Sequence, residues 1–484
     1  MDRWIVVELV AIAVLLRVIA LGDESLWFDE AYSVAFAGAD LSLLNFLRPG
    51  GFAFTDKNVY HILLHFWLGL GRTEFVIRLL SVIFGVATML VVLGVARRLF
   101  GGRAAAWAAG LLAVSPFHIW YSREARMYVL AGLFAWLAVL AVLEAVQRRR
   151  ALALWGMYAL CAALGLYTHT FSIFVVAAVN VWVAVVLIVE PARRKMLWPW
   201  LGANAALVAL AVPWFLGISA QQSQGWWAWI GQKYGTPGLK QLLLLPVDFA
   251  LGTIRPPWLW ALWLGAGCFG LGLLLGAVPP SRRRGESWWQ SGGREWACAM
   301  LLMVLPATVA FALAQVRPMF VLRYMVPFAP AFAIVAGRGF CQIRRAFLRW
   351  AVMIPYLAGV AAVLLVMYLV PQKEDWRGAA TYLTQHVPAG GTIFLVDEDI
   401  RVPLVHYYQA PADLHPVWRG HRSDADLEPK VAPVMARVSE FWLVVSHTDN
   451  DALEQYLWRF ADVVERQEFR DIVILHFRRR GGAG

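Results

Sequence analysis

Two adjacent carboxylates, Asp29 and Glu30, stand in the stretch SLWFDEAYS, between a Trp-Phe pair and Tyr32. A carboxylate that is partly buried among aromatic rings has a raised pKa and can act as a general base near neutral pH. Adjacent residues of a helix point about 100° apart, so the two side chains cannot aim at one atom. The pair therefore predicts one catalytic carboxylate, with Asp29 the stronger candidate, and one that braces it. The alternative interpretation is a pair of solvated loop charges or a helix N-cap.

Further polar side chains collect at the ends of apolar runs, where they are costly unless they have partners. They are Asp56 and Lys57 in FTDKNVYH, Arg123, Glu124 and Arg126 in YSREARMY, His169 in YTHT, and Arg317 and Arg323 in RPMFVLRY. Cations at the depth of lipid headgroups suit a phosphate or pyrophosphate. Carboxylates suit activation of a hydroxyl, or a divalent metal. Together these residues predict a cleft with carboxylates at one wall and cations at another, and structural pairing among them is the alternative.

The composition is that of a polytopic membrane protein. Of the 484 residues 60% are hydrophobic and 15% are charged, against roughly 25% charged residues in soluble proteins. The net charge of +11 does not indicate nucleic acid, because the basic residues fall in short clusters between apolar runs, as at the cytoplasmic ends of membrane spans. The four cysteines have no metal-ligand spacing and imply no disulfide framework.

Apolar runs long enough to cross a bilayer, which takes roughly 20 residues, recur along the first 370 residues. They cover 4–22, 79–96, 103–121, 127–146, 151–168, 171–190, 197–218, 258–278, 297–315, 322–337 and 351–370. The sequence therefore predicts about eleven transmembrane helices, the first of them uncleaved. Basic clusters at every second boundary predict a cytoplasmic N-terminus and an outer C-terminus. The run at 59–71 is too short to cross and is expected to lie at the outer interface.

The last part of the chain, from residue 372 to 484, has ordinary charge density and alternating patterns. DWRGAATYLTQHV and DALEQYLWRFADVV are typical of helices, and TIFLV, EFWLVVSH and DIVILHF are typical of strands. These patterns predict a small α/β domain outside the membrane, following a transmembrane domain over residues 1–371.

Several motifs, in order, resemble the membrane-embedded GT-C glycosyltransferases, in the branch of family 39, the aminoarabinose-transferase-like group and the related protein mannosyltransferase-like bacterial proteins. LWFDEAYS is similar to the first-loop aspartate motif, and HILLHFWLGLGRTEFVIRLLSVIFGV to an interfacial helix that leads into the second span, with Arg78 and Ser81. SPFHIWYSREARMY, LYTHTF, RYMVPFAPAFAIVAG and KEDWRGAATYL follow at the expected places. The resemblance covers nearly the whole chain and implies the GT-C fold.

The resemblance implies an inverting sugar transfer from a polyprenyl-phosphate donor at the outer face of the bacterial or archaeal cytoplasmic membrane. Asp29 would deprotonate an acceptor hydroxyl on a glycolipid, a glycan or a protein, with Glu30 beside it. The implied phosphate ligands are Lys57, Arg323 and Arg126, and the implied supporting residues are Asp56, Tyr32, Arg123, Glu124, His169 and Arg78. Metal dependence stays open: the carboxylates of Asp29 and Asp56 would hold a divalent cation (Mg, Mn or Zn), and the alternative is a reaction without a cofactor. One departure concerns Lys57 and Asp56, because many relatives have a His-Pro-Pro or Lys-Pro-Pro sequence where this chain has DKNVY.

Other functions use similar chains. A transporter or flippase of lipid-linked sugars would also be polytopic, but its ionisable residues are expected near the bilayer centre and its halves are expected to repeat. An O-antigen ligase or polymerase would use the same donors with a large outer loop of its own. A non-catalytic binding protein with a degraded site would not need Asp29. The expected partners are therefore the lipid-linked donor, membrane lipids and a hydroxyl acceptor, and no nucleic acid.

Overall fold

The structure is a computed structural model that describes residues 3–38, 58–148, 151–221, 234–254, 261–417, 423–446 and 451–480. The chain forms two compact units. The first, called the membrane unit below, comprises residues 1–21, 40–72 and 76–370. The second, called the C-terminal unit, comprises residues 22–39, 73–75 and 371–484. The second unit thus joins the segment that carries Asp29 to the tail of the chain, and the domain limits of 1–371 and 372–484 stay a prediction.

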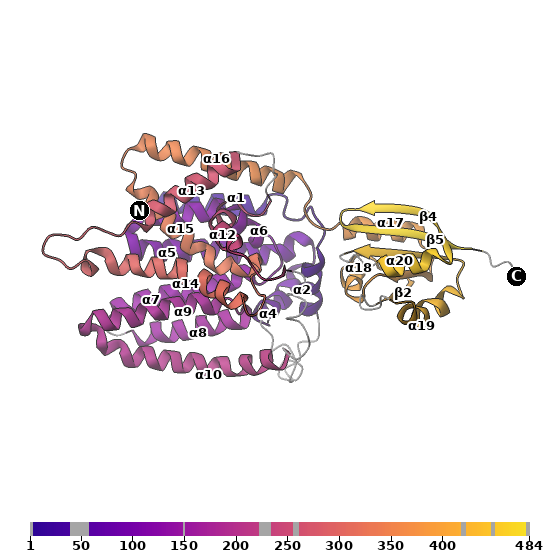
Figure 1. Cartoon of the computed structure of the whole chain (residues 1–484), viewed down its shortest axis with the longest axis horizontal. Helices are drawn as coiled ribbons and strands as arrows, with labels where there is room; N and C mark the ends of the chain where they lie inside the picture. The colour runs from indigo at the N-terminus through magenta and orange to yellow at the C-terminus, as the bar shows by residue number, and fades with distance from the viewer. Residues whose placement is uncertain are drawn as a thin grey trace. The chain divides into compact units, whose positions relative to one another are not determined.

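The membrane unit is built from long apolar helices that pack side by side (Figure 1). They are α1 (Arg3–Val18), α4 (Asn58–Trp67), α5 (Glu74–Val114), α6 (Pro116–Ser122), α7 (Tyr128–Gln147), α8 (Leu152–Thr168), α9 (Ser172–Val189), α10 (Leu197–Gln221), α12 (Leu239–Leu251), α13 (Ala261–Ala277), α14 (Arg294–Ala314), α15 (Ala329–Gln342) and α16 (Ala346–Leu369). Short 3-10 segments at Leu68–Leu70, Pro191–Met196 and Leu322–Phe328 and a π-helical segment at Trp289–Gly293 connect or extend them.

Among the described residues, seven helices are long and apolar enough to cross a membrane, judged by length and composition. Three shorter apolar helices, Val59–Leu70, Leu152–Thr168 and Leu262–Ala277, accompany them. The first predicted span is the 16-residue helix α1. An integral membrane protein is therefore confirmed, whereas the count of about eleven spans stays a prediction.

The longest helix, α5, bends back on itself at Gly101, whose φ of 85° and ψ of 175° are not helical. A Cβ placed on Gly85 would lie 3.4 Å from the Nε of Arg17. The same guanidinium donates hydrogen bonds to the carbonyls of Leu112 and Ala113, at 3.4 and 3.0 Å. Both arms of α5 therefore meet the same side chain, and the two separate runs predicted at 79–96 and 103–121 form a helical hairpin that turns at a glycine.

Helices α13 and α15 pack through glycines. A Cβ on Gly276 would lie 1.9 Å from the carbonyl oxygen of Val335, and one on Gly339 would lie 1.9 Å from that of Gly272. Small residues allow helix backbones to approach closely where lipid removes the hydrophobic driving force for association.

We therefore expect Gly276→Ala to destabilise the membrane unit by roughly 1–3 kcal/mol, because the added methyl group forces the two backbones apart. Gly270→Ala on the same helix is the matched control, since nothing lies within 4 Å of its Cβ position. Thermal unfolding of the purified protein in detergent measures both variants. Equal unfolding temperatures for the two would contradict this packing.

The C-terminal unit contains a five-stranded sheet in the order β2-β1-β3-β5-β4. The strands are β1 (Gly391–Leu395), β2 (Ala412–Pro416), β3 (Glu440–Ser446), β4 (Ala461–Phe469) and β5 (Ile472–Arg479). β1 pairs in parallel with β2 and β3, and β5 pairs antiparallel with β3 and β4. The helices are α2 (Phe28–Gly38), α17 (Trp376–His386), α18 (Arg401–Tyr407), α19 (Asp424–Met435) and α20 (Asp451–Trp458).

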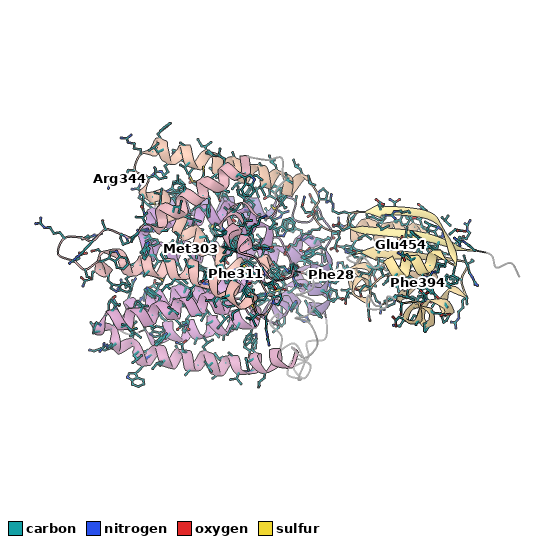
Figure 2. All side chains as sticks on the ribbon, viewed as in Figure 1. Phe28, Met303, Phe311, Arg344, Phe394 and Glu454 are labelled. Atoms are coloured by element: carbon teal, nitrogen blue, oxygen red, sulfur yellow. The ribbon has the colours of Figure 1, made fainter. Side chains whose placement is uncertain are left out.

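The central strands of the sheet are buried on both faces. Ile393 and Leu395 belong to one apolar cluster, which also contains Trp376 of α17, whereas the intervening Phe394 belongs to a second cluster with Leu427 of α19. This alternation follows from the two-residue period of a strand. Phe394 is labelled among the side chains of Figure 2, and Phe28 of α2, also labelled there, packs against the first cluster.

The predicted α/β domain is confirmed, with one correction of an element. The stretch DALEQYLWRFADVV is not helical throughout, because α20 ends at Trp458 and β4 begins at Ala461. The β-branched residues Val463 and Val464 favour the extended backbone, and Val463 pairs with Phe477 of β5. The tertiary partner of this segment, β5, follows it in the chain and completes a hairpin.

Candidate active site

Glu30 is completely buried in the C-terminal unit and forms an ion pair. Its Oε2 atom lies 3.0 Å from the Nζ of Lys373, whose side chain is only 8% exposed. The same oxygen accepts a weak hydrogen bond of 3.4 Å from the backbone N–H of Trp27, at the start of α2. Two charges removed from water need each other, since either one alone would be a buried, uncompensated ion. Glu30 is therefore the buried member of the acidic pair, and the bracing role of this residue stays a prediction.

The segment before α2 is held by the chain just after the last membrane helix. Glu374 is buried, and its carboxylate accepts hydrogen bonds from the N–H of Phe28 at 3.0 Å and from the indole of Trp376 at 2.6 Å. The hydroxyl of Ser25 donates to the Glu374 carbonyl at 2.6 Å. The hydroxyl of Tyr407 accepts from the N–H of Leu26 at 2.7 Å. These bonds satisfy the backbone groups at the start of α2, which no helical partner can satisfy.

Asp29 lies in the first turn of α2 and is half-buried. Its carbonyl accepts a hydrogen bond from Ser33 at 3.1 Å, as in a regular helix with a serine four residues on. The rings of Phe28 and Tyr32 lie tilted against one another, with centroids 5.0 Å apart and an angle of 42° between their planes. The N-terminal position favours the ionised carboxylate of Asp29 through the helix dipole. Asp29 is thus presented at the surface of a helix whose other acidic residue is fixed inside.

Tyr32 is tied to the segment before α18. Its hydroxyl donates to the carboxylate of Asp399 at 2.9 Å. Burial, with the negative charge of Asp399 as the next cause, raises the pKa of the Tyr32 hydroxyl well above its usual value. The hydroxyl is therefore a permanent donor at working pH, and Tyr32 anchors α2 instead of titrating.

In the membrane unit, two predicted arginines flank a cluster of rings. The ring centroid of His169 lies 4.8 Å from that of Tyr324 and 5.7 Å from that of Tyr128. The guanidinium of Arg126 lies 5.7 Å from the Tyr128 ring, and that of Arg323 lies 5.7 Å from the Tyr324 ring. Rings of this kind stabilise a nearby cation. The structure thus brings Arg126, Arg323 and His169 together from three distant segments.

Glu124 is buried two residues before Arg126, and its backbone carbonyl accepts a hydrogen bond of 2.7 Å from the N–H of Arg126. The ring of Tyr121 lies 5.7 Å from that of Tyr128. The supporting role of Glu124 stays a prediction.

Arg78 of α5 and Arg123, which follows α6, both donate hydrogen bonds to backbone carbonyls at or just after the end of α1. Arg78 donates to the carbonyl of Leu21 at 2.9 Å. Arg123 donates to the carbonyls of Arg17, Ile19 and Ala20 and lies 5.0 Å from the ring centroid of Tyr368. Both arginines thus satisfy carbonyls that the end of a helix leaves without partners. Their contacts support the chain as it leaves α1.

Two predicted residues, Asp56 and Lys57, lie outside the described residues. Within the described ranges no group of three or more His, Cys, Asp or Glu side chains is arranged to hold a metal ion. Metal binding by Asp29 and Asp56 therefore stays a prediction, and the reaction proposed below contains no step through a metal.

Sequence reasoning missed the residues that hold α2. Lys373, Glu374 and Tyr407 lie more than 340 residues from the acidic pair along the chain, and no local pattern relates them to it. Tyr128 and Tyr324 belong to the motifs YSREARMY and RPMFVLRY. A tyrosine at a membrane interface is common, so the residue type alone did not mark either one as part of a site. The one available signal was the acidic and basic cluster KED directly after the last apolar run.

The fold is that of the membrane-embedded GT-C glycosyltransferases. The chain is similar to the crystal structure of ArnT from Cupriavidus metallidurans in the apo state, with a TM-score of 0.63 and 16% identity over 97% of each chain. It is similar to the oligosaccharyltransferase of Archaeoglobus fulgidus in its apo form, with a TM-score of 0.51 and 12% identity over 92% of this chain and 70% of that one. The chain is also similar to the mycobacterial arabinofuranosyltransferase AftD, with a TM-score of 0.50 and 14% identity over 98% of this chain and 41% of that one.

The sequence comparison points to the same branch. A family model described as dolichyl-phosphate-mannose-protein mannosyltransferase matches residues 59–216. No match was found among curated protein sequences. The predicted GT-C fold is thus confirmed, and the family model agrees with the predicted mannosyltransferase-like resemblance over residues 59–216.

Proposed function

We propose that this chain is an inverting glycosyltransferase that moves a sugar from a polyprenyl-phosphate donor to a hydroxyl acceptor. The observation that carries the proposal is the similarity of fold to ArnT over nearly the full length of both chains. One ArnT structure in that comparison contains undecaprenyl phosphate, with a TM-score of 0.62 to this chain. Archaeal oligosaccharyltransferase structures of the same fold contain dolichol phosphate or an acceptor peptide.

The proposed step needs a base and a stabilised leaving group. The proton of the acceptor hydroxyl passes to the carboxylate of Asp29 while the hydroxyl oxygen bonds to the anomeric carbon. The bond between that carbon and the phosphate oxygen breaks, and its electron pair leaves with the polyprenyl phosphate. Attack from the side opposite the phosphate inverts the anomeric configuration. Arg126 and Arg323 are assigned to the phosphate, because charge-assisted bonds to guanidinium groups stabilise the negative charge that develops on it.

The reaction is assigned to the extracytoplasmic face of the cytoplasmic membrane. The support is the distribution of basic residues, since Lys and Arg clusters mark cytoplasmic loops. Arg193, Arg194 and Lys195 form one such cluster, in the connection between α9 and α10. Arg126 precedes α7, His169 follows α8 and Arg323 precedes α15. With the Arg193 cluster in the cytoplasm, these helix ends are assigned to the outer side.

The proposed function is tested by the lipids that accumulate in cells. In a strain in which the gene for this protein is deleted, mass spectrometry of extracted lipids should find a raised level of a polyprenyl-phosphate sugar. A molecule of the cell envelope should lack the same sugar. Expression of the wild-type chain should reverse both changes. Unchanged lipid-linked sugars in the deletion strain would contradict the proposal.

We expect Arg323→Ala to raise the KM for the polyprenyl-phosphate sugar by about 10- to 100-fold, because a charge-assisted hydrogen bond contributes about 1.5–3 kcal/mol. Arg344→Ala is the matched control, since Arg344 is an exposed arginine of the same membrane unit with no assigned role. Steady-state transfer at varied donor concentration measures both. A normal KM for Arg323→Ala would remove this arginine from the donor site.

A further inference from the structure

A groove of about 640 Å³ lies within the C-terminal unit, lined by residues of helix α17 and the edge strand β4. This volume falls in the range of about 300–1,000 Å³ that small-molecule sites occupy. Its lining includes Tyr382, Gln385, His386, Glu465, Gln467 and Phe469. None of them belongs to the candidate active site described above.

One wall of the groove is aromatic. The rings of Tyr382 and His386, one turn apart on α17, are stacked with centroids 4.0 Å apart and an angle of 20° between their planes. The Nδ1–H of His386 donates to the carbonyl of Tyr382 at 2.8 Å, which holds the imidazole in this orientation. Phe469 of β4 meets Tyr382 at 6.0 Å, edge to face. The groove thus has a rigid ring surface before any ligand is bound.

The polar groups around this wall are planar and mostly neutral. Glu465 makes a hydrogen bond to the hydroxyl of Tyr382, and burial together with this bond raises the pKa of Tyr382 to about 12. Gln385 and Gln467 add two amide groups, each with donors and an acceptor. Their amides, with the carboxylate of Glu465, match the paired hydroxyls of a pyranose ring, which donate and accept side by side.

Two charged residues of the groove lining, Asp375 and Arg377, already have partners within the protein. Arg377 forms an ion pair with Glu74, and Asp375 accepts a hydrogen bond of 2.9 Å from the N–H of Gly378 as the N-cap of α17. The carboxylates of Asp375 and Glu465 disfavour an anionic ligand such as a phosphate. A neutral ligand with an apolar face and a dense set of hydroxyls fits better.

We propose that this groove binds a neutral saccharide, namely the glycan part of the acceptor, with a sugar ring on Tyr382 and His386. This assignment rests on the proposed function, because it names a substrate class for the same transferase. The apolar C–H face of a pyranose packs on the ring surface, as apolar groups pack on aromatic faces generally. The hydroxyls at its edge bond to Gln385, Glu465 and Gln467. The acceptor is then a glycan or a glycolipid.

Saturation-transfer NMR on the full chain in detergent micelles tests this assignment, with maltotetraose, chitotetraose and α-1,6-mannotetraose as probes. At least one tetrasaccharide should receive saturation from the protein. Tyr382→Ala and Gln385→Ala should each weaken its binding by tenfold or more. Gln409→Ala is the matched control, since Gln409 is an exposed glutamine of the same unit outside the groove, and it should bind like the wild type.

Binding of none of the three probes would overturn the assignment, as would wild-type affinity in both groove variants. The same titration in the Asp29→Asn variant separates the two proposals. If the tetrasaccharide binds normally while Asp29→Asn still transfers sugar, the proposed base fails and the groove stands. If transfer requires Asp29 but no groove variant changes binding, the groove fails and the proposed function stands.

Discussion

Asp29→Asn is expected to lower the rate of sugar transfer by about 10²- to 10⁴-fold, the usual contribution of a general base. Asparagine has the same shape as aspartate and cannot accept the proton of the acceptor hydroxyl. Since Asp29 is half-buried in the first turn of α2, its replacement leaves the buried Glu30–Lys373 pair intact. The loss should therefore appear in kcat, with little change in donor binding. Single-turnover transfer from a polyprenyl-phosphate sugar measures it.

Asp23→Asn is the matched control for this result. Asp23 is an exposed aspartate of the same unit, six residues earlier, and only its carbonyl is used, in a hydrogen bond from Arg377. Its variant should transfer sugar at the wild-type rate. Wild-type turnover in Asp29→Asn would remove the proposed base, and equal losses in both variants would show that this segment responds to any change of charge.

Glu30→Ala is expected to destabilise the attachment of α2 to the C-terminal unit by about 3–5 kcal/mol, because it leaves Lys373 buried without its partner. Amide hydrogen exchange of the full chain, read from peptides covering residues 22–38 and 371–376, measures this change. Exchange there should become more than a hundredfold faster where the opening of α2 limits it.

Two further variants make the Glu30 result specific. Glu30→Leu combined with Lys373→Met should recover most of the protection, since an apolar pair of similar volume carries no desolvation cost. Glu440→Ala breaks the exposed pair with Arg478 in the same unit and should leave the exchange of these peptides nearly unchanged. Equal effects of Glu30→Ala and Glu440→Ala would contradict a bracing role for the buried pair.

The sequence predicted the features that depend on local patterns. The apolar runs at 127–146 and 171–190 correspond to α7 and α9, and TIFLV and DIVILHF correspond to β1 and β5. Periodicity and turn residues are contained in short windows, so these elements need no knowledge of the rest of the chain. A helix N-cap at the acidic pair was one of the alternative interpretations, and the structure has the acidic first turn of α2 there, which is favourable.

The sequence did not predict the contacts that join distant segments. The pairing of Glu30 with Lys373 and the bond between Tyr32 and Asp399 depend on a tertiary arrangement. For the same reason, α2 was expected in a loop of the transmembrane domain, whereas it belongs to the compact unit of the C-terminal residues. The edge strands β2 and β4 were missed, since β2 contains His415 and Pro416 and β4 is rich in charged residues, which are weak signals for a strand.

The stereochemistry and balance of the transfer test the central claim most directly. The purified chain is supplied with a polyprenyl-phosphate sugar of known anomeric configuration and a hydroxyl acceptor, and the products are followed by NMR. We predict one free polyprenyl monophosphate for each glycosidic bond formed, with the opposite anomeric configuration in the product. Retention of configuration, or movement of the intact lipid-linked sugar across the bilayer without release of polyprenyl phosphate, would contradict the proposed reaction.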